Sequence, residues 1–171
     1  MRFSMIIAAT ALLLLTGCTD GESGGGGTPD GYVRGAGAKV SLAYPKSWTA
    51  APATTTTPVD ARDGANAQIQ VLEEVSKAGS ADLLGDIAQT SPQLQAPGYE
   101  RKGSKKISVP GAQAATRIDY VYKTDQGVPA AGVGLGILDK DDHVHVVRLS
   151  WLTGKLDDSA VEDIIDSVKV T

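Results

Sequence analysis

Cysteine is nearly absent from this chain, which has one such residue, Cys18, among 171. A single cysteine excludes a disulfide framework and a cysteine-rich zinc module within the chain. Histidine is also scarce, with two residues, and aromatic residues make up 5% of the composition. Sixteen basic residues stand against twenty acidic ones, for a net charge of −4, so the chain lacks the basic excess typical of nucleic-acid binders. We therefore expect no nucleic-acid partner.

Long hydrophobic runs are absent as well, apart from Met5–Leu15, which is interrupted only by Thr10. This run follows the positive charge of Arg2, and that order is typical of an export signal. The run is too short to cross about 30 Å of hydrocarbon, which needs about 20 apolar residues. We therefore expect a signal peptide at residues 1–17 and no transmembrane helix in the mature protein.

The hydrophobic run leads directly into Leu15-Thr16-Gly17-Cys18. This segment resembles the bacterial lipobox, in which small residues precede an obligatory cysteine. The resemblance implies that Cys18 receives a diacylglyceryl thioether and becomes the first residue after cleavage. Two acyl chains hold a protein stably on a membrane, whereas one chain holds it only marginally. We expect a lipid anchor on Cys18 at the extracytoplasmic face of the cell membrane; the alternative is an ordinary secretory signal with an incidental cysteine.

Residues 18–37 are rich in glycine and lack apolar periodicity. Such a composition is typical of a flexible linker. Gly21–Gly25 fits the G-x-S-x-G pattern of serine hydrolases, but that motif requires a strand-to-helix turn, which a linker does not provide. The sequence therefore predicts a flexible tether at residues 18–37, followed by a single folded domain at residues 38–171.

The folded domain reads as a series of strands separated by short turns. Alternating or apolar segments predict strands at residues 39–44, 67–75, 99–109, 113–123, 130–138 and 143–153, with a short edge strand or extended loop at 51–58. Tight turns between successive strands favour antiparallel pairing, because parallel neighbours need long crossovers.

Two helices complete the predicted domain. Ser80 is expected to cap a helix that ends near Thr90, before Ser91-Pro92. Asp157 or Asp158 is expected to cap a C-terminal helix with one apolar stripe, formed by Val161, Ile164, Ile165 and Val168. The sequence therefore predicts an α+β fold, with two helices on an antiparallel sheet of about six or seven strands.

The domain opens with a strand that ends in Tyr44-Pro45-Lys46-Ser47-Trp48 and closes with a helix that contains Ile164–Val168. The first motif resembles the YP-x-x-W opening of PsbP-like domains. With the lipobox and the polar tether, the chain resembles actinobacterial lipoproteins of the LpqN/LpqT type, which are linked to the PsbP/Mog-type fold. The resemblance covers residues 38–171 and implies an α/β/α sandwich with a non-catalytic adaptor or binding role. It transfers no catalytic residue.

The candidate site residues lie on the last predicted strand. His143 and His145 are two residues apart, so they share a face and form a possible metal half-site, to which the aspartates of the 139–142 turn could add oxygens. The same face carries Trp151, so the histidines can equally be the polar end of a core stripe. We favour the structural interpretation, and expect no metal, cofactor or catalytic residue; His143, His145 and Trp151 remain weak ligand-binding candidates.

Two further segments have alternative interpretations. Gly132-x-Gly134-x-Gly136 lies within a strand, where alternate glycines favour close packing of a helix or aromatic rings over a ligand groove. Arg101–Lys106 is a basic cluster, interpreted as a solvated face or as a contact for an anionic lipid or envelope polymer.

These observations predict a membrane-anchored extracytoplasmic lipoprotein whose domain binds an envelope protein, a lipid or a small molecule. The alternative is a metal-dependent hydrolase, or a small-ligand-binding protein, that uses the strand carrying His143 and His145.

Overall fold

The computed structural model describes residues 28–77 and 80–171. The predicted signal peptide, Cys18 and the first part of the predicted tether lie outside these residues. The described residues form the strands β1 (Tyr32–Ala36), β2 (Val40–Pro45), β3 (Thr49–Ala50), β4 (Val59–Asp63), β5 (Ala67–Lys77), β6 (Glu100–Ile107), β7 (Ala114–Lys123), β8 (Pro129–Leu138), β9 (His143–Leu152) and β10 (Lys169–Val170). They also form the short 3-10 helix η1 (Ala81–Leu83) and the helices α1 (Leu84–Gln95) and α2 (Asp158–Asp166). Nowhere in this part of the chain is a helix long and apolar enough to cross a membrane.

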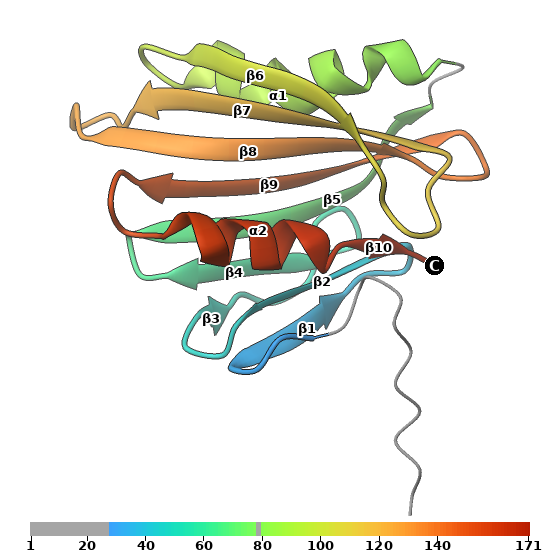
Figure 1. Ribbon diagram of the computed structural model, residues 1–171, viewed down its shortest axis with the longest axis horizontal. Coiled ribbons are helices and arrows are strands. Elements are labelled where there is room, and N and C mark those ends of the chain that lie inside the picture. The colour runs from blue at the N-terminus through green and yellow to red at the C-terminus, as the bar shows by residue number, and fades with distance from the viewer. Residues whose placement is uncertain (1–27, 78–79) are drawn as a thin grey trace, which may run out of the picture.

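The strands form two antiparallel sheets. The larger has seven strands in the order β3-β4-β5-β9-β8-β7-β6, and the smaller has three in the order β1-β2-β10. Helix α1 lies on one face of the larger sheet, while α2 and the smaller sheet cover the other face (Figure 1). The predicted α+β class, the antiparallel sheet of up to seven strands and the two helices are confirmed.

The main core lies between the larger sheet and the layer of α2 and β2. Alternate side chains of the central strands point into it and meet the predicted apolar stripe, whose four residues are all buried. Three of them lie on α2, and Val168 follows the end of that helix. The core includes Leu42, Ile69, Val71, Leu135, Val147, Leu149, Val161, Ile164, Ile165 and Val168. The N-cap of α2 is Asp157, whose carboxylate accepts the backbone N–H of Ala160 at 2.7 Å. Period-two strands and a helix with one apolar stripe thus meet on a common interior, as their patterns predict.

Helix α1 packs on the glycines of β8. A Cβ at Gly136 would overlap the carbonyl oxygen of Leu84, and a Cβ at Gly134 would lie 3.3 Å from the carbonyl oxygen of Ala88. Leu84 and Ala88 are fully buried at this contact. The third glycine, Gly132, lies beneath the ring of Tyr120. The close-packing interpretation of these glycines is therefore confirmed for the helix and for one aromatic ring.

The N-terminal boundary of the domain differs from the prediction. Residues up to 37 were expected to belong to the tether, but Tyr32–Ala36 form β1 and pair along their whole length with β2. The local sequence has no strand-like alternation, so this strand depends on its partner. Gly35 suits that partner closely, because a Cβ there would lie 2.9 Å from the ring of Tyr44.

Residues 51–58, expected as a short edge strand or an extended loop, form the loop, and β4 (Val59–Asp63) after them pairs with β5 from Val59↔Val71 to Asp63↔Ala67. The predicted end of the first helix is wrong. Helix α1 continues past Ser91-Pro92 to Gln95, with Pro92 inside it. Pro92 is buried, and the N–H of Ala96 donates to its carbonyl oxygen at 2.9 Å, so tertiary packing and this final hydrogen bond outweigh the local preference of proline.

Candidate functional site

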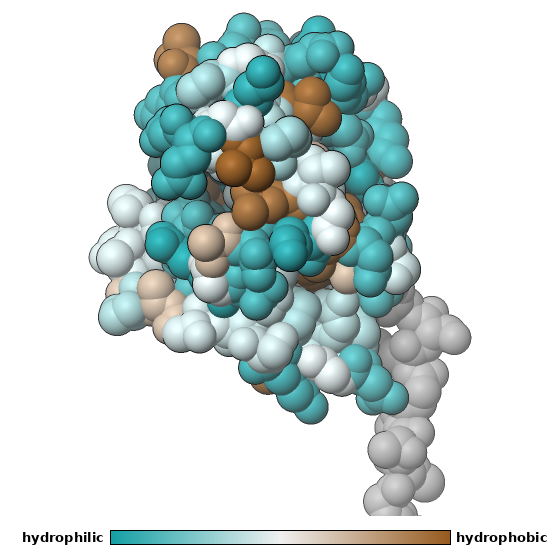
Figure 2. Space-filling view, turned by 90° about the vertical axis from the view of Figure 1, so that its left-hand side faces the viewer, coloured by the Kyte–Doolittle hydropathy of each residue, from teal (hydrophilic) through white to brown (hydrophobic). Residues whose placement is uncertain are grey.

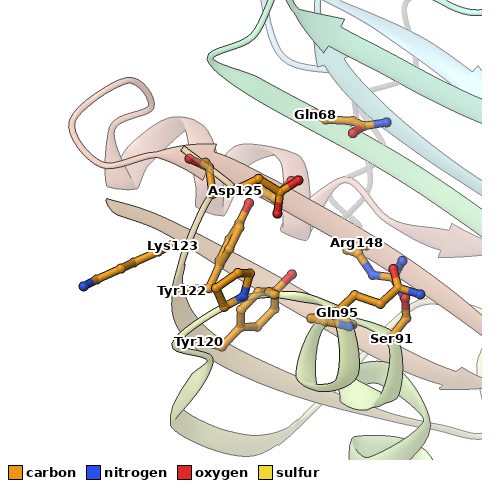
Figure 3. Close-up of a pocket in the computed structure, with 13 residues that line it drawn as sticks. Gln68, Ser91, Gln95, Tyr120, Tyr122, Lys123, Asp125 and Arg148 are labelled. Carbon is orange, nitrogen blue, oxygen red and sulfur yellow. The ribbon is translucent and has the colours of Figure 1, made fainter. Parts of the chain in front are cut away.

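A cavity of about 480 Å³ lies beside the C-terminal half of α1, on the face of the larger sheet that this helix covers. We call it the α1 cavity. It is lined by Ser91, Pro92 and Gln95 of α1, Tyr120, Tyr122 and Lys123 of β7, Arg148 and Ser150 of β9, Gln68 of β5, and the connecting residues 96–97 and 124–125 (Figure 3). Residues from four elements therefore converge on one space.

The α1 cavity exists because α1 covers only part of its sheet face. The helix packs on β8, β7 and, less extensively, β9, whereas β5 lies beyond it. The uncovered side chains are polar: the amides of Gln68 and Gln70 donate to the carboxylate of Asp60 at 2.8 and 2.9 Å. Figure 2 shows the end of the molecule where β7 and β9 finish. Its surface is mostly hydrophilic (teal), with a limited hydrophobic area (brown). The space beside the helix is thus bounded by polar groups on one side.

Arg148 is a partly buried cation in the wall of the α1 cavity. It faces Gly134 and Gln70 in the strand register. Its Nε atom is buried without a hydrogen-bond partner, and within residues 28–77 and 80–171 its guanidinium forms no ion pair. Burial lowers the pKa of the Arg148 guanidinium, and the nearby Tyr120 only partly opposes this effect. The fold therefore holds a cation beside the cavity without supplying its counter-charge.

Tyrosines form the wall next to Arg148. The ring centroids of Tyr99 and Tyr120 are 5.3 Å apart, and those of Tyr120 and Tyr122 are 6.0 Å apart. Tyr99 is held by a hydrogen bond from its hydroxyl to the Gln89 side chain at 3.1 Å. Burial raises the pKa of Tyr120, so its hydroxyl stays protonated at neutral pH. The wall is aromatic and uncharged.

His145, one of the residues singled out in the sequence, is fully buried. Its Nδ1 accepts the backbone N–H of Glu74 at 3.2 Å, and its Nε2 lies 3.0 Å from Oδ2 of Asp139. This pattern assigns the proton of a neutral ring to Nε2, which donates to Asp139. Both ring nitrogens are therefore used within the fold.

His143 is partly buried, and its Nδ1 lies 3.8 Å from Oδ2 of Asp139. One potential ligand atom each from Asp139, Asp141 and His143 lie within 4.8 Å of one another. However, Oδ1 of Asp139 accepts the backbone N–H groups of Asp141 and His143, both at 2.9 Å, and Oδ2 faces His145. Burial raises the pKa of Asp139, but these hydrogen bonds outweigh it and hold the pKa below its usual range. The arrangement serves the turn between β8 and β9.

Trp151 does not join the two histidines in a site. It shares their strand face, but eight residues of extended chain separate it from His143, a distance of about 26 Å. Trp151 is partly buried and lines two smaller cavities of about 230 and 360 Å³. Neither histidine lines these cavities or the α1 cavity.

The basic cluster Arg101–Lys106 lies on β6, an edge strand of the larger sheet. Its four cationic residues are all exposed, and Lys102 pairs with Glu100 at 2.7 Å. The strand at the opposite edge, β3, has only two residues. The cluster is therefore a solvent-facing edge, as the solvated-face interpretation predicts.

Sequence reasoning missed Arg148. The available signal was a single charge on an otherwise apolar strand, in His143–Leu152, at a position that alternation directs away from the main core. That pattern indicates which face the residue occupies. It does not indicate whether a carboxylate from another element meets it.

No protein-family model matches the chain, and no curated protein matches its sequence. Among solved structures, LpqN of Mycobacterium tuberculosis, described as involved in cell envelope biogenesis, matches with a TM-score of 0.57 and 16% identity, over 77% of this chain and 83% of LpqN. The Ran-binding protein Mog1p of Saccharomyces cerevisiae matches with a TM-score of 0.53 and 11% identity, over 84% of this chain and 96% of Mog1p. At these identities the likeness concerns the fold, and it confirms the PsbP-like fold expected from the Tyr44–Trp48 motif.

Proposed function

We propose that this chain is a lipid-anchored binding module of the cell envelope, in which the α1 cavity receives a small ligand. The observation that carries the proposal is the cavity itself, with a partly buried Arg148 in its wall that forms no ion pair with any other described residue and whose Nε lacks a hydrogen-bond partner among them. A volume of about 480 Å³ is within the range of small-molecule sites. The mixed polar and aromatic lining provides both orientation and contact area for such a ligand.

The chemistry of the lining favours binding over catalysis. Ser91 and Ser150 supply hydroxyl groups, but both histidines lie outside the lining, so neither serine has an imidazole base beside it. The only cysteine, Cys18, is assigned to the lipid anchor and is not available as a nucleophile. We therefore propose a non-catalytic role.

The envelope location is supported by two independent features. The lipobox at Leu15–Cys18 provides the anchor, and the fold is shared with LpqN, which is described as involved in cell envelope biogenesis. A lipid on Cys18 would hold the domain on the extracytoplasmic face, next to the molecules that it binds.

Site-specific photo-crosslinking in the native membrane tests this function. A photoreactive benzoylphenylalanine replaces Asp125, an exposed residue of the cavity lining, or Lys155, which is exposed in the β9–α2 connection outside the α1 cavity. We expect an adduct of small-molecule mass at position 125 and none at position 155, read by mass spectrometry of the mature chain. Identical products at both positions, or an unmodified residue 125, would contradict a ligand in the α1 cavity.

A further inference from the structure

We propose that the α1 cavity binds an oxyanion, a carboxylate or phosphate group carried by a small organic molecule, and that Arg148 pairs with it. This proposal rests on the proposed function for the location of the site. It adds the charge and the chemical class of the ligand.

The first argument is the contrast between the partly buried Arg148 and the buried Arg117. Arg117 pairs with Glu162 through Nη1 at 2.8 Å, and its Nη2 pairs with Asp119 at 2.8 Å. Even the exposed Arg62 pairs with Asp60 at 3.2 Å. A partly buried cation without a partner is costly, because it loses hydration without gaining a counter-charge. An anion that enters the cavity would supply that charge.

The second argument is the set of neutral donors around the guanidinium. In Figure 3, Gln95 and Ser91 of α1 lie on the same side of the cavity as Arg148. An amide N–H₂ and a hydroxyl complement the planar fork of a guanidinium, which holds carboxylates and phosphates with two parallel hydrogen bonds. The Tyr120 hydroxyl is a further protonated donor. Each of these side chains can therefore donate a hydrogen bond to an oxyanion.

The charged residues at the rim do not cancel this preference. Asp125 is the carboxylate of the lining, and it forms no ion pair with Arg148 within the described residues. Figure 3 shows the Lys123 side chain directed away from the cavity. The charge that faces the interior on the α1 side is thus that of Arg148.

The remaining lining residues indicate the chemical character of the uncharged part of the ligand. Tyr120 and Tyr122 form one wall, and Pro92, Ala96 and Pro97 add apolar surface. Aromatic faces bind planar or aliphatic groups through contact area rather than charge. A small organic acid or phosphate ester with an apolar body therefore matches the cavity better than a free inorganic ion.

Calorimetric titration of the mature, lipidated chain in nanodiscs tests this inference. The probes are benzoate, phenyl phosphate and the neutral, isosteric benzamide. We expect at least one anion to bind at least about tenfold more tightly than benzamide, because truncating one partner of a desolvated charge pair weakens binding by at least this factor. Tighter binding of benzoate identifies a carboxylate ligand, and tighter binding of phenyl phosphate identifies a phosphate ligand.

Variants separate the role of Arg148 from a general effect of charge. Arg148→Gln is expected to weaken binding of the preferred anion by about tenfold or more. Arg148→Lys is expected to restore part of it, since a point charge remains without the planar fork. Arg62→Gln, a matched loss of an arginine on the same sheet, should change the affinity by less than about twofold, because Arg62 is exposed and already paired. Circular dichroism verifies that each variant is folded.

Three results would overturn the inference: equal binding of benzamide and the anions, unchanged binding by Arg148→Gln, or no binding of either anion at millimolar concentration. Equal binding of all probes would leave the proposed binding function intact. Conversely, failure of crosslinking at position 125 in the membrane, with anion binding retained in vitro, would count against the proposed function alone.

Discussion

At the scale of single residues, Glu73 joins the two sheets. Its carboxylate is buried and accepts the backbone N–H groups of Ala38, Lys39 and Val40 at 3.1, 2.8 and 2.7 Å. The residue belongs to β5 of the larger sheet, and the amides that it binds lead into β2 of the smaller one. A bulge between Leu72 and Ser76, with Glu74 at a φ of 51°, interrupts the pairing of β5 at this point. The carboxylate thus closes a backbone turn that strand pairing leaves open.

Glu73→Gln should destabilise the protein by about 2 kcal/mol, because an amide has one acceptor oxygen and turns an N–H₂ group toward backbone donors. Urea unfolding measures the free energy of unfolding. The neighbouring, exposed Glu74→Gln serves as control and should change it by less than about 0.5 kcal/mol. Equal effects of the two substitutions would show that the buried carboxylate is not the joint between the sheets.

The lowered pKa of Asp139 predicts how the stability of the protein depends on pH. Its folded-state pKa lies below the unfolded value of about 3.9, since hydrogen bonds outweigh the effect of burial. The ionised carboxylate therefore stabilises the fold above that pH, and this contribution is lost as the pH falls through the folded pKa. We expect the free energy of unfolding to decrease between pH 6 and pH 3, and to decrease less in Asp139→Asn. Urea titrations at both pH values provide the measurement, and an identical decrease in the variant would contradict this role.

At the scale of elements, the contact of α1 with β8 depends on the absence of side chains. The carbonyl oxygens of Leu84 and Ala88 approach the strand where Gly136 and Gly134 leave room for them. The same close approach places the C-terminal end of α1 beside Arg148, so the depth of the α1 cavity depends on how tightly the helix is seated.

Gly136→Ala should destabilise the protein by about 1–3 kcal/mol, because the added methyl group overlaps backbone atoms of α1 that cannot rotate away. Gly134→Ala should cost less, since its Cβ would lie 3.3 Å from the nearest atom of the helix. Urea unfolding of both variants gives the order. A larger loss in Gly134→Ala would mean that α1 is seated differently.

The elements also show how far sequence reasoning reaches. Strands β7, β8 and β9 and the stripe of α2 were predictable, because alternation and helical spacing are written in consecutive residues. Strand β1 was not, because it follows the glycine-rich segment directly and is too short to show alternation, and it forms a strand by pairing with β2. Beside the candidate site, Gly132, Gly134 and Gly136 could be interpreted in advance as a packing surface. The unpaired state of Arg148 could not, because it depends on which carboxylates distant elements place near β9.

At the scale of the whole molecule, the predicted anchor and the described domain lie close together in sequence. In the described part of the chain the first strand, β1, begins at Tyr32, fourteen residues after Cys18. The lipid would thus be attached a short distance from the β1 side of the domain. Helix α1 lies on the opposite face of the larger sheet from β1, and β6 lies at the sheet edge far from β1 (Figure 1). We therefore expect the α1 cavity to be on the part of the domain remote from the anchor.

Cys18→Ala should abolish lipid labelling and leave the precursor uncut, because the acceptor thiol is missing. Metabolic labelling with a radioactive fatty acid, followed by electrophoresis, provides the measurement. Incorporation of label into Cys18→Ala would show that the lipobox interpretation is wrong, and release of a labelled mature chain from the wild-type precursor is the positive control.

If the proposed lipid anchor holds the domain on a membrane, the two edges of the larger sheet have a further consequence. Molecules confined to a membrane meet one another far more often than molecules in solution, and open strand edges can then join copies into continuous sheets. Here one edge is a strand of two residues, β3, and the other, β6, carries Arg101, Lys102, Lys105 and Lys106. Two copies that approached through β6 would place like charges side by side, a common protection against edge pairing. The basic strand β6 can thus keep densely anchored copies of the domain monomeric, so that each α1 cavity stays accessible.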